Sequence, residues 1–282
     1  MKLEIFRALW GTDGNLMKAA QEALDAGFDG IESPAPEDDH GYRQIMDMRE
    51  KTGLLWNAEI CSGGGYVPQR NLSVHEHLMN LRSAFTYLKA LEPQRINCIA
   101  GLDAWPSDVV VDFYQRALDL ADSNALNVLF ETHRSRPMFT PWGTQRLLEI
   151  LPELEITADI SHWCVVSERL MDTELDIIHD IAPHVRHIHA RVGYDQGPQV
   201  PHPAAPEYAD ALASHECCWT LFWEAQRASS HDTITMTPEF GIDGYLHHLP
   251  FTDVPVADLW SVNQWMANRL RAQFGKWQRA SD

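Results

Sequence analysis

Short apolar segments rich in β-branched residues alternate with longer amphipathic segments along the chain, and this alternation restricts the fold more than any other feature. Short apolar runs of this length and composition are typical of buried strands. They cover residues 3–9, 30–32, 54–60, 95–100, 127–132, 155–160, 185–190 and 233–239. Strands separated by helical segments indicate parallel βαβ units, because a parallel connection needs a crossover of helix length.

The segments between these strands carry signals for helix ends. Asn15 and Gly27 bracket one helical pattern, since Asn caps helix starts and Gly favours helix ends. Ser73 is followed three residues later by Glu76, which is the capping-box pattern of a helix start. Further helices are expected to begin at Ser107, Pro141 and Pro255. The repeated strand and helix patterns therefore predict an α/β protein.

The chain length then selects among α/β folds. A closed (β/α)₈ barrel typically needs about 250 residues, and this chain has 282. An open dinucleotide-binding sheet would carry a glycine-rich loop after its first strand, and no such loop follows residues 3–9. We therefore predict one domain, a single (β/α)₈ TIM barrel over residues 1–282.

The charge of the chain restricts its partners. It has 40 acidic residues against 22 Lys and Arg, which gives a formal net charge of −18. A surface this negative repels phosphate backbones and anionic lipids, so we expect no nucleic-acid or membrane partner. The five cysteines are odd in number and lack paired spacing, and no segment is typical of a signal peptide or a membrane span. These features predict a cytoplasmic protein with reduced thiols.

Four successive strands in the second half of the chain end in possible metal ligands. These ligands are Glu131, Asp159, His189 and Glu239. The first two separations, 28 and 30 residues, each match one βα unit. The third, 50 residues, adds a segment rich in Gly and Pro, residues 192–206, which is either an active-site loop or a surface loop. The four residues should therefore meet at the carboxyl-terminal face of the barrel, where barrel enzymes place their active sites.

A divalent metal ion would explain why these residue types are found together. Three carboxylates and an imidazole are costly to bury unless they are paired or coordinate a metal. Three oxygen donors and one nitrogen donor suit Mn²⁺, Mg²⁺, Co²⁺ or Zn²⁺ without choosing among them. The alternative is that each is an ordinary polar residue solvated at the barrel mouth. Four such residues in register on consecutive strands favour the metal site.

The pattern of these four strand ends resembles the xylose isomerase-like barrel superfamily of sugar isomerases and epimerases, which also includes nucleases of the endonuclease IV type. The resemblance covers essentially the whole chain and rests on the two Glu residues, an Asp-x-x-His motif (Asp159, His162) and a His-x-His motif (His187, His189). It implies that the metal ligands are Glu131, Asp159, His189 and Glu239. It also implies that His162 contacts the substrate beside the metal, and it favours His189 over His187 as the ligand.

The resemblance implies a metal-dependent sugar isomerase or epimerase, with Mn²⁺ as the expected ion and a small carbohydrate as the substrate. Chelation of the substrate would make a C–H next to the carbonyl acidic, and Glu131 and Glu239 would exchange its proton as base and acid. Further residues at strand ends are expected to bind the substrate, namely Trp10, Glu32, Glu59, His133 and Arg191. The superfamily also suggests a homodimer or homotetramer.

Three alternatives stay open. A metal-dependent lyase, dehydratase or deglycosidase would use the same ligands together with an additional acid, which the sequence does not place. The second alternative is a barrel that has lost catalytic activity and only binds a ligand. An abasic-site nuclease is disfavoured, because it needs further His ligands on the early strands and a basic surface. The ketohexose 3-epimerases follow the metal His with Gly-Glu and then a substrate-binding Arg. Here Ala190 and Arg191 follow His189 directly, so that specific assignment is in doubt.

Overall fold

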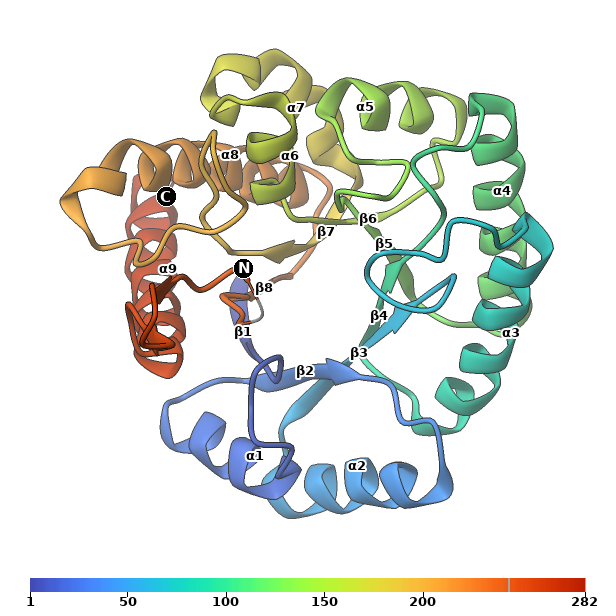
Figure 1. Cartoon of the computed structure of the whole chain (residues 1–282), viewed down its shortest axis with the longest axis horizontal. Coiled ribbons are helices and arrows are strands. Elements are labelled where there is room, and N and C mark those ends of the chain that lie inside the picture. The colour runs from blue at the N-terminus through green and yellow to red at the C-terminus, as the bar shows by residue number, and fades with distance from the viewer. Residues whose placement is uncertain (243, 282) are drawn as a thin grey trace.

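All eight predicted strands form, and each pairs in parallel with its neighbour in the sequence until the last pairs with the first. The result, seen in a computed structural model that describes residues 1–242 and 244–281, is a closed (β/α)₈ barrel with its helices outside (Figure 1). The predicted fold is therefore confirmed. Residues 243 and 282 of the predicted domain lie outside the described residues.

The strands are short and their observed bounds lie close to the predicted ones. They are β1 (Lys2–Ala8), β2 (Gly30–Pro34), β3 (Leu55–Cys61), β4 (Arg95–Ile99), β5 (Val128–Glu131), β6 (Ile156–Ala158), β7 (Val185–His189) and β8 (Thr233–Thr237). The main helices are α1 (Leu16–Asp25), α2 (Asp39–Thr52), α3 (Val74–Leu91), α4 (Ser107–Ser123), α5 (Pro141–Ile150), α6 (Ser161–Ser167), α7 (Leu175–Ile181), α8 (Ala209–Ala228) and α9 (Leu259–Ser281). Short 3₁₀ turns cover Met171–Glu174, Ala182–His184 and Pro206–Tyr208.

Most helix starts follow the sequence signals. Asn15 caps α1, and Ser73 and Glu76 form the predicted capping box at the start of α3. The prediction for Pro255 is wrong. Pro255 lies in a two-stranded hairpin, β9 (His248–Leu249) with β10 (Val254–Pro255), and α9 begins only after Asp258, which accepts a hydrogen bond from the Ser261 amide.

Strand alternation separates the core from the site. In β7, Ile188 is fully buried in the apolar layer between strands and helices, whereas His187 and His189 point into the barrel. Alternate side chains of a strand point to opposite faces, which is why one strand serves both layers. No helix among the described residues is both long and apolar enough to cross a membrane.

The segment at 192–206 is held by polar contacts to its neighbours. The Gly193 amide donates to His215 of α8, and the Gln199 side chain makes two hydrogen bonds with the backbone of Gly241. A Cβ atom on Gly193 would lie 2.7 Å from the Ser161 carbonyl oxygen, so the backbone of this segment lies against the start of α6. The segment therefore packs against Ser161, whose hydroxyl accepts a hydrogen bond from Arg191 at the barrel mouth.

Candidate active site

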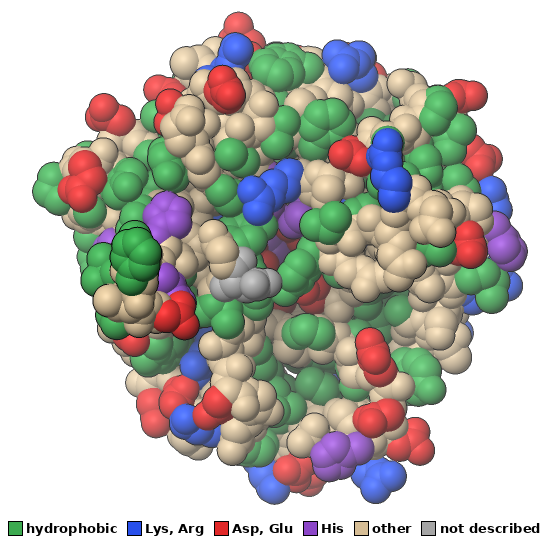
Figure 2. All heavy atoms as spheres, viewed as in Figure 1, with side chains coloured by type: hydrophobic (Ala, Val, Ile, Leu, Met, Phe, Trp, Pro, Cys, Tyr) green, Lys and Arg blue, Asp and Glu red, His purple; other side chains and the backbone are tan. Residues whose placement is uncertain are grey.

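The four predicted ligands meet at the carboxyl-terminal mouth of the barrel. Glu131 and His189 end β5 and β7, Asp159 directly follows β6, and Glu239 lies two residues beyond β8. One ligand atom from each lies within 4.8 Å of the others, and all four residues are buried. Figure 2 shows acidic and histidine side chains inside the hollow at the centre of the barrel. The regular βα spacing of the sequence brings them together.

The His189 ring has a defined orientation. Its Nε2 lies 2.7 Å from Glu32 Oε1, so this nitrogen donates to a carboxylate beneath the cluster. Its Nδ1 faces the cluster, 3.1 Å from Glu239 Oε2 and 3.7 Å from Glu131 Oε1. Neither Nδ1 nor Glu239 Oε2 makes a hydrogen bond. Two buried polar atoms that face each other and make no hydrogen bond indicate a place for a ligand.

Asp159 and Arg191 link the cluster to its support. Asp159 Oδ1 accepts hydrogen bonds from the amide and the hydroxyl of Ser161, and Oδ2 contacts the Arg191 guanidinium. Arg191 also lies 3.4 Å from Glu239 Oε2 and donates to His162 Nε2 at 2.9 Å. A fully buried guanidinium therefore orients two carboxylates and one imidazole at once.

Negative charge is in excess around this space. The carboxyl groups of Glu32, Glu59, Glu131, Asp159 and Glu239 belong to overlapping clusters, whereas Arg191 is the one guanidinium in contact with the four-residue cluster among the described residues. Burial raises the pKa of Glu131 and of Asp159. Burial also favours a higher pKa for Glu239, but the charges of His189 and Arg191 outweigh it and the net pKa is lowered.

The donor set fits a divalent cation. Burial opposes a charge on His189, but Glu239, Glu32 and Glu131 outweigh it and hold its pKa well above the usual value. A positive charge at Nδ1 is therefore strongly favoured, and an ion there would satisfy the unpartnered atoms. A carboxylate that accepts from the other ring nitrogen is the usual support of a metal-binding His, and Glu32 is in that position.

Four of the predicted substrate-binding residues line a small cavity above the cluster. These are Trp10, Glu59, His133 and Arg191, and they enclose about 20 Å³ together with Glu131 and Glu239. Sequence reasoning missed three other lining residues, namely Tyr66, Ile99 and Tyr245. Tyr66 and Tyr245 lie in loops, whose paths have no periodic signal, whereas Ile99 could have been found as the last residue of β4.

Glu32 and His162 are buried below the residues that line the small cavity. Glu32 accepts hydrogen bonds from Asn57 and Thr237 in addition to His189, and one of its oxygens lies 3.1 Å from His187 Nε2. The structure therefore places Glu32 beneath the cluster and not among the residues lining the small cavity. His162 is fully buried, and burial holds its pKa well below the usual range.

Aromatic rings close one side of the cavity. Trp10 packs on Gly241, where a Cβ atom would lie 2.1 Å from the indole ring. The Tyr245 ring meets Trp10 edge-on at 4.9 Å and lies 4.6 Å from the Arg191 guanidinium. Burial lowers the pKa of the neighbouring His133 to about 3, so this imidazole is neutral at neutral pH.

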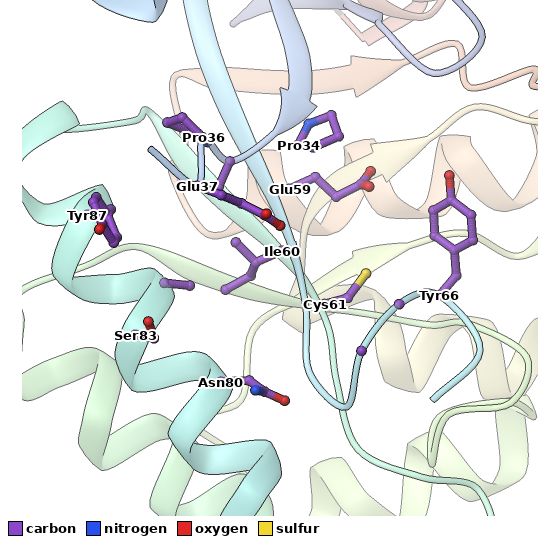
Figure 3. A pocket seen from close by; sticks show the side chains of 14 residues that line it. Pro34, Pro36, Glu37, Glu59, Ile60, Cys61, Tyr66, Asn80, Ser83 and Tyr87 are labelled. Atoms are coloured by element: carbon purple, nitrogen blue, oxygen red, sulfur yellow. The ribbon is translucent and has the colours of Figure 1, made fainter. Parts of the chain in front are cut away.

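A much larger groove opens beside the small cavity. It has a volume of about 600 Å³ and lies between the segment after β2 and the exposed face of α3 (Figure 3). Glu59 and Tyr66 line both spaces. Burial and the charges of Glu239 and Glu131 hold the pKa of Glu59 well above its usual value, so Glu59 is an acid that keeps its proton at the junction.

Comparisons with known proteins agree with the architecture. The family model described as xylose isomerase-like TIM barrel matches residues 20–198. An L-ribulose 3-epimerase structure aligns over 100% of this chain and 97% of its own, with a TM-score of 0.67 and 12% identity. A 3-keto-D-glucoside 4-epimerase from E. coli covers 96% of this chain and 100% of its own, with a TM-score of 0.61 and 13% identity.

Endonuclease IV from Thermus thermophilus shares the same fold. Its alignment covers 98% of this chain and 100% of its own, with a TM-score of 0.60 and 12% identity. No curated protein sequence matches this chain. Epimerases and a nuclease thus share this fold at similarly low sequence identity, and the choice of chemistry must come from the site.

Proposed function

This chain belongs to the xylose isomerase-like TIM barrel family, and from that premise we propose that it is a metal-dependent isomerase or epimerase of a sugar or sugar derivative. The observation that carries the proposal is the buried cluster of Glu131, Asp159, His189 and Glu239, in which two facing atoms make no hydrogen bond. A divalent ion held there, with Mn²⁺ expected and Mg²⁺, Co²⁺ or Zn²⁺ as alternatives, would polarise a substrate carbonyl.

The two Glu residues are suited to opposite parts in a proton transfer. Among the protein's own groups, the charges of His189 and Arg191 outweigh burial and lower the net pKa of Glu239, whereas burial raises the pKa of Glu131. A divalent ion bound by both residues would favour the carboxylate form of each. Two titratable groups whose surroundings separate their pKa values commonly mark the base and the acid of a site. In our proposal Glu239 takes the proton next to the carbonyl, and Glu131 returns one to the product.

Arg191 and His162 would position the substrate above the metal cluster. The guanidinium faces the small cavity, and it is fixed by Asp159 and by the His162 ring. Its Nε and Nη2 donors are taken by Ser161, Asp159 and His162. Nη1, which lies 3.5 Å from the Glu239 carbonyl oxygen, is therefore the donor left for a substrate oxygen. We propose that His162 acts through Arg191, and that Trp10 and His133 form the walls against which the substrate rests.

The first experiment is elemental analysis of the wild-type protein and of Glu239→Gln, prepared identically. We expect about one equivalent of metal in the wild type and much less in the variant, because one of four ligands is lost. Glu207→Gln, on an exposed turn, is the matched control and should bind metal as the wild type does. If the wild type holds no metal after reconstitution, the proposal fails.

The second experiment follows the proton. An isomerase or epimerase should incorporate solvent deuterium into unreacted or product sugar when metal-loaded protein is incubated with ketoses or aldoses in D₂O. Glu131→Gln should reduce that exchange by about 10²-fold or more, the usual contribution of acid–base catalysis. Metal binding without exchange on any sugar would contradict the isomerase proposal.

A metal-dependent lyase or dehydratase is the second candidate, and Glu59 is the observation that favours it. A β-elimination needs an acid near the leaving group, and Glu59 keeps its proton at the edge of the cavity. Loss of water or of an alcohol from the substrate, measured by mass, would identify this reaction. Glu59→Gln should then abolish it, whereas proton exchange next to the carbonyl should persist.

The nuclease alternative has less support from the site. All histidines in the metal-capable clusters of the described chain come from β5 onward, namely His133, His162, His187 and His189. A nuclease of this superfamily would need further His ligands from the early strands, and the charge of −18 opposes DNA binding. We also propose a cytoplasmic location, which the composition and the cysteines support, and a homodimer or homotetramer, which rests on the superfamily alone.

A further inference from the structure

The groove beside the candidate metal cluster is large and has a defined wall. It runs from Pro36 and Glu37 after β2 to Asn80 and Ser83 on α3, and Figure 3 shows these side chains around it. Its inner wall is the loop after β3. Arg136, itself fully buried, fixes that loop by donating to the carbonyl oxygens of residues 62, 65 and 66. The wall is therefore held by the protein before any ligand binds.

The volumes of the two spaces decide where a substrate fits. Sites for small molecules usually measure about 300–1,000 Å³. The cavity above the cluster offers about 20 Å³, which is room for a water molecule or for one functional group. The groove offers about 600 Å³. A substrate whose reacting carbons lie above the cluster must therefore place most of its atoms in the groove.

The chemistry of the groove selects an uncharged, hydroxylated group. Glu37 and Glu59 supply carboxyl groups, Asn80 and Ser83 supply neutral polar groups, and Tyr87 supplies a half-exposed ring. None of the described residues that line it is Lys or Arg. With no Lys or Arg among these lining residues to pair with it, a phosphate or carboxylate would be unfavourable beside the acidic Glu37. Sugar hydroxyls can instead bond to the carboxyl groups and the neutral polar groups, and a sugar face can pack on the aromatic ring.

The two spaces adjoin each other, because Glu59 and Tyr66 border both. We propose that the groove is the binding site for a second, uncharged sugar or polyol unit, so that the substrate is a glycoside or similarly extended molecule and not a free or phosphorylated monosaccharide. This inference rests on the proposed function, since it takes the cluster as the reacting centre. It names the substrate class of that site.

The test is a binding measurement on metal-loaded protein with disaccharides as probes. Cellobiose, maltose and trehalose are compared with glucose and glucose 6-phosphate by calorimetry or ligand-observed NMR. Ser83→Trp fills the groove from α3, and Tyr87→Ala removes an aromatic face. Met79→Trp is the matched control, because Met79 is exposed on the same helix but lines a different depression next to α4. Metal content and melting temperature are measured for every variant.

We expect at least one disaccharide to bind more tightly than glucose by about tenfold. Ser83→Trp and Tyr87→Ala should weaken that binding by a similar factor, with unchanged metal content, whereas Met79→Trp should leave it as in the wild type. Equal binding of the disaccharides in Ser83→Trp and wild type would overturn the inference. So would tighter binding of glucose 6-phosphate than of every disaccharide, or no disaccharide binding at all.

The same measurements distinguish a failure of the proposed reaction from a failure of the groove inference. If wild-type protein binds no metal, but the disaccharides still bind and Ser83→Trp still weakens them, the groove is a sugar site and the reaction proposal is wrong. If metal binds and deuterium exchange occurs with free monosaccharides as fast as with disaccharides, the reaction proposal stands and the groove inference is wrong.

Discussion

The hydrogen bond between Glu32 and His189 fixes which ring nitrogen faces the carboxylates. With Nε2 committed to Glu32 at 2.7 Å, only Nδ1 is left for an ion. Glu32→Gln should lower metal affinity by about 10–100-fold, the usual effect of losing such a support, with the fold intact. Titration with Co²⁺ or Mn²⁺ measures this.

Glu59→Gln is the matched control for that prediction. Glu59 faces the same space but lies at the cavity edge, outside the four-residue cluster of Glu131, Asp159, His189 and Glu239. Because Glu59 already keeps its proton, replacement by the neutral amide should change metal affinity little. An equal loss of affinity in both variants would show that overall negative charge, and not the orientation of His189, determines binding.

His215 should make the fold sensitive to acid. Burial lowers the pKa of His215 to about 4 in the folded protein, whereas in the unfolded chain His215 has its ordinary pKa of 6.5. Between these two pH values only the unfolded chain binds a proton at this residue. Stability is therefore greatest above pH 6.5 and falls as the pH is lowered toward 4. Between about pH 7.5 and pH 5 His215 should contribute about 2 kcal/mol to the loss of stability, and His215→Gln should remove that contribution. Denaturant unfolding in the presence of a chelator measures the free energy.

The control for His215 is a histidine outside the core. His179 has a side chain that is 76% exposed, so His179→Gln should leave the slope of stability against pH as in the wild type. If His215→Gln also leaves that slope unchanged, the acid sensitivity arises elsewhere.

Single residues of the candidate site differ in how well the sequence predicts them. Glu131 and Asp159 were predictable, because they lie one βα unit apart in the sequence and so both lie at the carboxyl-terminal ends of neighbouring strands. The depth of Glu32 was not predictable, because it depends on His187 and Thr237, which come from strands far from β2 in the sequence. Tyr245 reaches the cavity from a loop, and its position depends on the path of that loop.

At the scale of elements, the segment 192–206 packs closely against the start of α6. A Cβ on Gly193 would lie 2.7 and 2.8 Å from backbone atoms of Ser161, which cannot move without shifting α6. Gly193→Ala should therefore destabilise the fold by about 1–3 kcal/mol. It should also weaken metal binding, because Ser161 holds Asp159. Thermal unfolding and a metal titration measure the two effects.

Gly275→Ala is the matched control. Gly275 lies in α9, where the nearest atom to an added Cβ is a flexible Arg279 nitrogen at 3.5 Å. Alanine favours a helix over glycine by about 1 kcal/mol, so this change should stabilise the protein slightly. A Gly193→Ala variant as stable as the wild type would mean that the contact with α6 is loose.

The strands were predictable as elements because each is a short segment rich in apolar and β-branched residues between longer helical patterns. The hairpin of β9 and β10 was not, since two residues per strand carry no periodic pattern. Pro255 misled for the same reason, because a proline suits a hairpin edge as well as a first helical turn.

For the whole molecule, we expect removal of the metal to lower stability. A ligand that binds only the folded state at about 100 times its dissociation constant adds about 2.7 kcal/mol. A chelator should therefore lower the melting temperature of the wild type but not that of Glu131→Gln. Identical shifts in both proteins would show that the chelator acts somewhere other than the cluster.

The two connected spaces are also a property of the whole molecule. The sequence indicates which residues reach the barrel mouth, but the division into about 20 Å³ and about 600 Å³ depends on how loops from β2, β3 and β8 pack on one another. Volumes left between packed loops have no local signal in a sequence.

The pairing of β1 with β8 has a consequence for synthesis. Lys2 pairs with Thr233, so one edge of the first strand stays open until 231 further residues have left the ribosome. At about 5–20 residues per second this takes about 10–50 s. During that time the nascent chain exposes an apolar strand edge, and it should rely on chaperones until the ring of strands can close.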